Sequence, residues 1–149
     1  MSQNDEQPTI DYQTLAELRY QIRRFLRFSE QAARLAEIEP QQYQLLLALK
    51  GLPEERKPTI GELAERLQIQ HNSTVELINR LVERHLVERR RDESDQRYAL
   101  IALTSDGEQV LQRLALSHQT ELQTIGPALL QVLETILAQK RLDSRFYKH

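Results

Sequence analysis

The sequence predicts a mainly α-helical fold with a small β component, an α+β arrangement of six helices and one hairpin. Apolar residues recur at helical spacing over most of the chain. Two short helical patterns follow each other between Thr59 and His85, and an Arg-rich stretch then alternates like a hairpin as far as Thr104. With 149 residues, the chain is long enough to bury one core of ordinary size.

The first two helices are separated by a proline. Residues 1–10 are polar and are expected to form a flexible N-terminal tail. A long amphipathic pattern follows from about residue 11 to 38 and ends at Glu39-Pro40, because proline disfavours helix in the residue before it. The next segment is apolar on most sides around Leu45–Leu49, which indicates a helix buried all round.

The third and fourth helices are short and are joined by a four-residue link. Thr59 with Glu62 three residues later forms a capping-box pattern, which marks the start of the third helix. The fourth helix ends near His85. Two strands joined by a charged turn follow it, which predicts a wing of two to three strands.

The last two helices are expected on either side of Gly126-Pro127. Ser105 with Glu108 is a second capping-box pattern, at the start of the fifth helix. Pro127 suits the first turn of a sixth helix, because the missing N–H is not needed there.

Long helices at both ends of the chain point to a homodimer. The lobe with the short helices and the wing covers about residues 40–104, and the flanking helices about 11–38 and 105–149. Residues 11–149 are expected to form a single structural unit. Each flanking helix carries an apolar stripe that one small domain cannot easily cover, and two-fold pairing with a second copy would cover both. The alternative is a monomer in which these helices pack on their own core.

Composition excludes several classes of function. The chain has no cysteine, so disulfides, thiolate metal sites and thiol-based redox sensing are excluded. No apolar run reaches the length of a membrane span and no secretion signal is visible, so a cytoplasmic protein without membrane contact is expected. The four histidines form no close-spaced metal signature, and no Gly-rich phosphate loop or nucleophile motif occurs. We expect neither an enzyme nor a cofactor or metal site.

Two short helices followed by a hairpin form a layout that reads DNA. On the fourth helix, Thr74, Leu77, Ile78 and Leu81 share the face that should pack on the domain. The opposite face carries polar side chains that hydrogen-bond bases or phosphates. An ordinary solvated face is the alternative. A net charge of −2 and a pI near 6.1 argue mildly against DNA binding, although net charge sets only non-specific attraction.

Arg97 is the sharpest candidate in the wing. A hairpin tip is thin enough to approach the narrow minor groove, whose negative potential attracts arginine, and Asp95 is placed to aim the guanidinium. The alternative is a surface ion pair on a turn. Together with the fourth helix, the candidate DNA-binding residues are His71, Asn72, Ser73, Thr74, Glu76, Asn79, Arg80, Arg90, Asp95 and Arg97.

The chain resembles the MarR family of winged helix-turn-helix transcription regulators. The resemblance is carried by Leu63–Leu67, Thr74–Leu81, Leu86–Arg89, Asp95-Gln96-Arg97 and Leu103–Gly107, and it spans nearly the whole chain. It implies a homodimer that binds pseudo-palindromic double-stranded DNA, with the second helix of the motif in the major groove and the wing arginine in the minor groove. It also implies a repressor that a small ligand, often a phenolic or other aromatic acid, releases from DNA.

Two positions depart from the family pattern. His85 stands where glycine usually precedes the wing, so it must either adopt a strained backbone or end the helix differently. Glu76 stands where many members carry a polar or basic residue, so the resemblance does not define the base preference, although it still implies the docking mode.

The ligand implied by the resemblance has few visible contacts in this sequence. Aromatic residues cluster in the first two helices, and core packing is their alternative role. The candidates for ligand contact are Tyr20, Phe28, Tyr43 and His118. The alternative function for the whole chain is a winged-helix module that serves protein–protein assembly without specific DNA binding.

Overall fold

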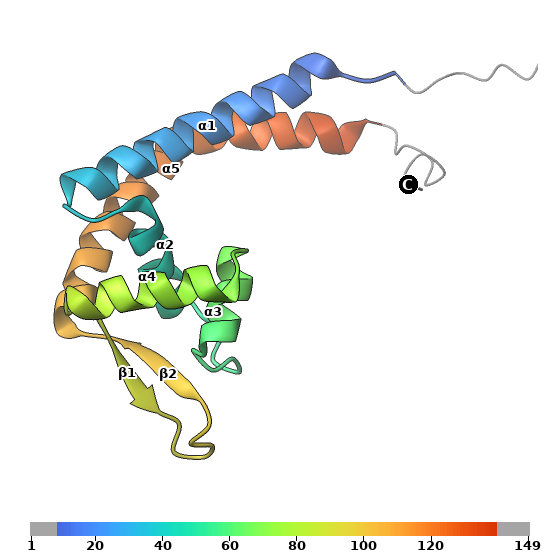
Figure 1. Cartoon of the computed structure of the whole chain (residues 1–149). Helices are drawn as coiled ribbons and strands as arrows, with labels where there is room; N and C mark the ends of the chain where they lie inside the picture. The colour runs from blue at the N-terminus through green and yellow to red at the C-terminus, as the bar shows by residue number, and fades with distance from the viewer. Residues whose placement is uncertain (1–8, 140–149) are drawn as a thin grey trace, which may run out of the picture. The chain divides into compact units, whose positions relative to one another are not determined.

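The computed structural model describes residues 9–139, which form five helices and one two-stranded antiparallel sheet (Figure 1). The mainly α winged-helix class is confirmed. The elements in chain order are α1 (Tyr12–Leu35), α2 (Pro40–Lys50), α3 (Ile60–Leu67), α4 (His71–Glu83), β1 (Val87–Arg91), β2 (Ala99–Leu103) and α5 (Ser105–Ala138).

The described chain divides into two compact units. The larger is Phe28–Thr120, and the smaller joins residues 9–27 to residues 121–139. Most of the predicted tail, residues 1–8, and the last ten residues of the predicted final helix lie outside the described part of the chain.

The prediction of six helices was wrong, because α5 runs without a break through Gly126-Pro127. Pro127 has no N–H to donate to the carbonyl of Gln123, but this removes a single bond from a helix of 34 residues. Proline therefore did not terminate the helix here.

The core of the larger unit lies beneath α2. Leu45 and Leu46 are fully buried, and α2 packs against α3, α4 and β2. The predicted packing face of α4 is confirmed, since Thr74, Ile78 and Leu81 are fully buried and Leu77 is nearly so. Periodicity alone had placed these side chains correctly.

Three helix ends share one capping geometry. Glu37, Gln68 and His85 follow α1, α3 and α4 with φ of 60°, 54° and 59°, in the left-handed region. After α4, the amide of His85 donates to the carbonyl of Val82 and the amide of Leu86 to that of Leu81, each at 3.0 Å, which is the Schellman motif. His85 therefore ends the helix as glycine would, at a cost of about 1 kcal/mol for its Cβ.

Two predicted N-caps differ in detail from the sequence expectation. Thr59 accepts a hydrogen bond from the amide of Glu62 at 3.1 Å, but its own amide donates to the carbonyl of Lys57, so only half of the capping box forms. At α5 the cap is Thr104 instead of Ser105, because the Thr104 hydroxyl accepts from the amide of Gly107 at 3.0 Å.

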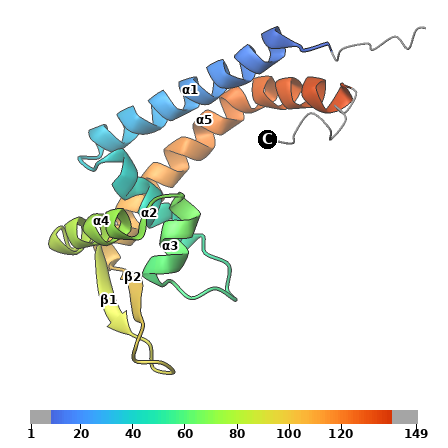
Figure 2. The ribbon, with the colours of Figure 1, turned by 45° about the vertical axis from the view of Figure 1, so that its right-hand side comes forward.

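The wing is a hairpin that projects away from the helices of the larger unit (Figures 1 and 2). Its register pairs Val87 with Leu103 and Arg91 with Ala99. The wing was expected to have two to three strands. In the structure it has two, and a single isolated bridge between Thr59 and Leu100 stands where a third strand would pair.

Glycine is required where the wing meets α5. A Cβ at Gly107 would lie 2.0 Å from the carbonyl oxygen of Leu86, closer than any side chain can approach. The same carbonyl accepts a hydrogen bond from the amide of Thr104 at 3.1 Å, and the Thr104 hydroxyl donates to the carbonyl of His85 at 2.6 Å. The end of α4, the base of the wing and the start of α5 are thus joined at one point.

The smaller unit presents apolar side chains to solvent. Gln139 donates to the Asp11 carboxylate at 2.8 Å, and the first part of α1 lies beside the last part of α5 (Figures 1 and 2). No helix in the described part of the chain is both long enough and apolar enough to span a membrane. The exposed apolar residues of this unit are Ile10, Tyr12, Leu15, Tyr20, Ile22, Leu26, Leu122, Leu130, Leu133 and Leu137.

Gly107 and Gly61 give a matched pair of substitutions. Gly107→Ala is expected to lower the free energy of unfolding by about 3 kcal/mol, because the Leu86 carbonyl must move. Gly61→Ala, in α3 with nothing within 4 Å of the added methyl, is expected to raise it by about 0.5–1 kcal/mol. Urea unfolding at one protein concentration measures both. Equal effects of the two substitutions would contradict the close approach at Gly107.

Candidate DNA-binding surface

The polar face of α4 is open to solvent. Asn72, Ser73, Glu76 and Asn79 are exposed, as is His71 at the first helical position. Thr74 is fully buried, and its hydroxyl donates to the carbonyl of Gln70 at 3.0 Å. This contradicts the inclusion of Thr74 among the DNA-contacting side chains, because its Cβ points along the apolar stripe of the helix.

The cations near the end of α4 have partners within the chain. Arg80 lies 3.6 Å from the Glu39 carboxylate, with both side chains well exposed. Arg89 of β1 donates to the side-chain oxygen of Asn79, which ties the wing to the exposed face of α4. An exposed ion pair is weak, so Arg80 can exchange Glu39 for another anion at little cost.

Arg97 and Asp95 form a two-pronged ion pair at the wing tip. Arg97 Nε donates to Asp95 Oδ1 at 3.0 Å and Arg97 Nη2 to Asp95 Oδ2 at 2.8 Å, while the Arg97 amide donates to Oδ1 at 3.2 Å. The Arg97 side chain is nevertheless 82% exposed. These hydrogen bonds lower the pKa of Asp95 and raise the pKa of Arg97, so the pair stays charged.

Two further side chains belong to the wing surface. Tyr98 is exposed, and the Arg97 guanidinium carbon lies 5.9 Å from the centre of its ring. Arg90 is exposed and donates through Nε to the Glu88 carboxylate at 2.8 Å on the same face of β1. Arg90 and Arg97 of the wing are therefore each paired with an acidic side chain, and Arg97 also lies near an aromatic ring.

The sequence analysis missed a third acidic residue of the wing, Asp92. It is buried, and one carboxylate oxygen accepts from Lys57 Nζ at 2.7 Å, while the other accepts from the amide and hydroxyl of Ser94 at 3.0 and 2.8 Å. Lys57 also donates to the Ser94 hydroxyl at 2.8 Å. The Asp-x-Ser spacing was a local signal for a side-chain turn, but Lys57 lies 35 residues away and had none.

Three of the four candidate ligand-contacting residues come together in the larger unit. The rings of Tyr43 and His118 are stacked with centroids 4.5 Å apart, and Phe28 meets His118 edge-on at 5.4 Å. Burial raises the pKa of the Tyr43 hydroxyl. Tyr20 belongs to the other unit, where Arg24 lies over its ring at 5.6 Å.

The hydrogen bonds of His118 define its tautomer. Nδ1 lies 2.7 Å from the carbonyl oxygen of Leu114, which only accepts, so Nδ1 carries a proton. In the neutral ring, Nε2 then accepts from the Ser29 hydroxyl at 2.7 Å. Within the described residues, no group of three or more His, Asp and Glu side chains is arranged to hold a metal ion.

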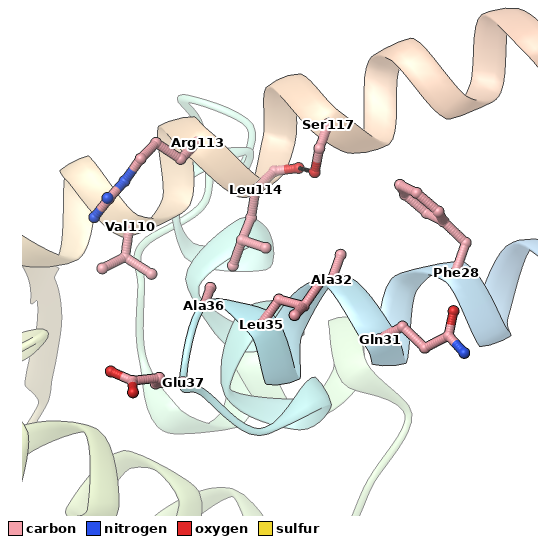
Figure 3. A pocket seen from close by; sticks show the side chains of 10 residues that line it. All are labelled: Phe28, Gln31, Ala32, Leu35, Ala36, Glu37, Val110, Arg113, Leu114 and Ser117. Carbon is pink, nitrogen blue, oxygen red and sulfur yellow. Dashed lines mark hydrogen bonds between the residues drawn. The ribbon is translucent and has the colours of Figure 1, made fainter.

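A cavity of about 590 Å³ opens beside this cluster, between the last turns of α1 and the first half of α5 (Figure 3). Leu114 and Val110 of α5 point toward Ala32 and Leu35 of α1, so most of the lining is apolar (Figure 3). The lining residues are Phe28, Gln31, Ala32, Leu35, Ala36, Glu37, Val110, Arg113, Leu114 and Ser117.

Known proteins share both the sequence pattern and the fold. A sequence profile of the MarR family matches residues 37–97, from the end of α1 to the wing tip. The organic hydroperoxide resistance transcriptional regulator of Bacillus subtilis is 31% identical over 104 residues, which cover 63% of this chain and 71% of that protein. The chain belongs to the MarR family.

A second relative matches a shorter part of the chain. The uncharacterized HTH-type transcriptional regulator YsmB of Bacillus subtilis is 34% identical over 82 residues, or 55% of this MarR-family chain. The match spans about half of that relative, 54% of its length.

Solved structures of MarR-family proteins have the same fold. A MarR family protein from Bacillus stearothermophilus superimposes with a TM-score of 0.67 at 26% identity, covering 87% of this chain and 94% of that one. A mutant of S. aureus MepR bound to an oligodeoxyribonucleotide gives a TM-score of 0.63 at 20% identity, covering 87% of this chain and 98% of that one. The second likeness concerns the fold alone.

Proposed function

We propose that this MarR-family regulator binds pseudo-palindromic duplex DNA as a homodimer, acts as a repressor, and is released by a small ligand. The observation that carries the DNA-binding part is Arg97, an exposed arginine held by Asp95 at the tip of a thin hairpin. A guanidinium in this position suits the narrow, electronegative minor groove.

The exposed face of α4 supports major-groove binding. Asn72 and Ser73 lie in its first turn, from which a recognition helix contacts base edges. Asparagine pairs with adenine through two hydrogen bonds, and Glu76 accepts from the amino group of cytosine. Glu76 also repels phosphate, so it disfavours binding in other registers. Arg80 is suited to a phosphate contact in exchange for Glu39.

Exposed apolar side chains on the smaller unit support the homodimer. Tyr12, Leu15, Leu130 and Leu133 are between 44% and 72% exposed, although they lie on long amphipathic helices. Pairing with a second copy would bury them. A two-fold dimer also places two recognition helices about 34 Å apart, which fits successive major grooves of a palindrome.

The cavity beside α1 and α5 supports a ligand with an apolar body and an anionic group. Its apolar lining comes from Phe28 and from aliphatic side chains of α1 and α5, and Arg113 is the one cation among its lining residues, which also include Gln31, Glu37 and Ser117 (Figure 3). A phenolic or other aromatic carboxylate matches this lining. The hydroperoxide relative suggests peroxide as another signal, but a chain without cysteine has no thiol to oxidise.

The wing is tested by Arg97→Ala in operator binding. The operator is first selected from random duplex DNA, and its affinity is then measured at several salt concentrations. Arg97→Ala is expected to weaken binding at least about tenfold. It should also reduce the slope of log affinity against log salt by about 1, since one cation close to the DNA phosphates is lost. Arg23→Ala, an exposed arginine of the smaller unit, is the charge-matched control and should bind as the wild type does.

One outcome would contradict DNA binding as a whole, and another would contradict the role of the wing alone. The alternative, a winged-helix module for protein–protein assembly, predicts no duplex binding even at low salt. An operator affinity that Arg97→Ala leaves unchanged would remove the wing from the interface while leaving α4 in place.

The homodimer is tested by placing charge on the exposed apolar face. Leu130→Glu with Leu133→Glu should convert the dimer into a monomer in sedimentation equilibrium, because four carboxylates would have to be buried at a two-fold interface. Leu116→Glu, the same type of substitution at an exposed leucine of the larger unit, should leave the mass unchanged. A wild-type protein that sediments as a monomer at micromolar concentration would contradict the proposal.

The ligand is tested with 4-hydroxybenzoate as the probe. Millimolar 4-hydroxybenzoate should lower the operator affinity of the wild type, and Arg113→Gln should raise the concentration needed for half of this effect about tenfold, since a charge-assisted hydrogen bond is lost. 4-Hydroxybenzyl alcohol, which keeps the phenol and lacks the carboxylate, is the control compound. Release that is equally efficient with both compounds would contradict the role given to Arg113.

A further inference from the structure

The wing tip has little intrinsic rigidity. The strands β1 and β2 have five residues each, and a two-stranded hairpin of this size is marginally stable on its own. Residues 92–98 connect them, which is much longer than the two-residue turns that hold hairpins tightly. Something other than the strand ladder must fix the direction in which Arg97 points.

Asp92 provides this constraint from within the wing. It lies at the end of β1, where its amide donates to the carbonyl of Tyr98 at 3.2 Å and closes the base of the loop. Its carboxylate is nearly inaccessible, with 7% of the side chain exposed, and it accepts hydrogen bonds from Lys57 Nζ and from the amide and hydroxyl of Ser94. A buried carboxylate remains charged only when it is paired in this way.

Lys57 provides the constraint from outside the wing. It belongs to the loop between α2 and α3, and its Nζ donates hydrogen bonds to both Asp92 Oδ2 and the Ser94 hydroxyl. The neighbouring backbone is also fixed, because the amide of Ile101 donates to the carbonyl of Pro58 at 2.9 Å. The lysine is thus attached to a rigid part of the larger unit.

The constraint reaches Arg97 through a short stretch of chain. Ser94, held by Lys57 and Asp92, is followed directly by Asp95, whose carboxylate holds the Arg97 guanidinium through two hydrogen bonds. The amide of Tyr98 in turn donates to the carbonyl of Asp95 at 3.2 Å. A single peptide bond therefore joins Ser94, which Lys57 and Asp92 hold, to Asp95, which orients the Arg97 side chain.

We infer that Lys57, Asp92 and Ser94 form a latch that fixes the wing tip, and that Lys57 and Asp92 are positioning residues for operator binding through Arg97. This inference rests on the proposed DNA-binding function. The hydrogen bond from Lys57, followed by those from Ser94, lowers the pKa of Asp92 to about 2, so the latch stays ionised and closed throughout the neutral range.

Asp92→Asn separates the latch from simple electrostatics, because the two predict opposite signs. Removing a negative charge from a DNA-facing hairpin should tighten binding if charge alone matters. If the latch positions Arg97, the same change should weaken operator binding between about threefold and tenfold, and by less than Arg97→Ala does. Glu93→Gln, the exposed neighbour with the same change in charge, is the matched control and should bind as well as the wild type or slightly more tightly.

A second set of variants shows whether the effect passes through Arg97. In an Arg97→Ala background, Asp92→Asn should cause no further loss of operator affinity, whereas a merely destabilising change would add its own loss. Lys57→Met, at a lysine whose side chain is 58% exposed, should weaken binding to the same extent as Asp92→Asn, and the double variant should be no weaker than either. Arg56→Met is its control in the same loop.

The outcomes distinguish the latch from the proposed function on which it rests. A wild-type protein that binds no duplex overturns the function itself. A wild type that binds and an Arg97→Ala variant that is weakened, together with an Asp92→Asn variant that binds as well as Glu93→Gln, overturn the latch alone. A loss on Asp92→Asn that persists in full without Arg97 also overturns it.

Discussion

The carbonyl oxygen of Leu86 occupies the space in which any residue other than glycine at position 107 would place its Cβ atom. Three elements depend on this contact. The carbonyl also accepts from the amide of Thr104, and Thr104 both caps α5 and binds the carbonyl of His85. The end of α4, the base of the wing and the start of α5 are therefore held together at one point, and this contact sets the direction in which the hairpin leaves α4.

The sequence predicted those features that depend on neighbours three or four residues away. The buried face of α4 followed from periodicity, and the positions of Arg97 and Asp95 followed from the hairpin pattern. The helix break predicted at Pro127 was wrong, because proline removes one hydrogen bond whereas the 33 other residues of α5 keep the helix continuous. The same periodicity placed Thr74 on the packing face, where the structure buries it, so its inclusion among the DNA-binding candidates disagreed with the pattern itself.

The features that could not be predicted are contacts between distant segments. Lys57 reaches Asp92 across 35 residues, and Arg84 donates to the Gln42 side chain across 42. No pattern in either segment specifies such a partner, since exposed lysines and acidic turns are common. The close approach of Leu86 to Gly107 is another contact between distant segments that the sequence could not predict. A glycine in the first turn of a helix was the one local sign of it. Tertiary packing decides these pairs, and a single sequence carries no record of it.

The charges of the proposed DNA-binding surface are balanced within the protein. Arg97, Arg90 and Arg80 are each paired with an acidic side chain, and the whole chain carries a net charge of −2. A phosphate that binds Arg80 or Arg90 must therefore displace Glu39 or Glu88, whereas Arg97 keeps the carboxylate of Asp95 that orients it. This exchange contributes little to non-specific attraction, and it makes affinity depend on whether all the contacts can be made together.

The left-handed helix caps at Glu37, Gln68 and His85 affect which substitutions this sequence can accept during evolution. The chain places none of its four glycines at a positive φ, although three helix ends adopt that conformation. The Cβ atom at each of these positions lowers the free energy of unfolding by about 1 kcal/mol, and a change to glycine would remove this cost. These three positions lie outside the exposed face of α4 that is proposed to contact DNA. A change to glycine at any of them can therefore offset a destabilising substitution on that face, so the proposed DNA contacts can vary without loss of the fold.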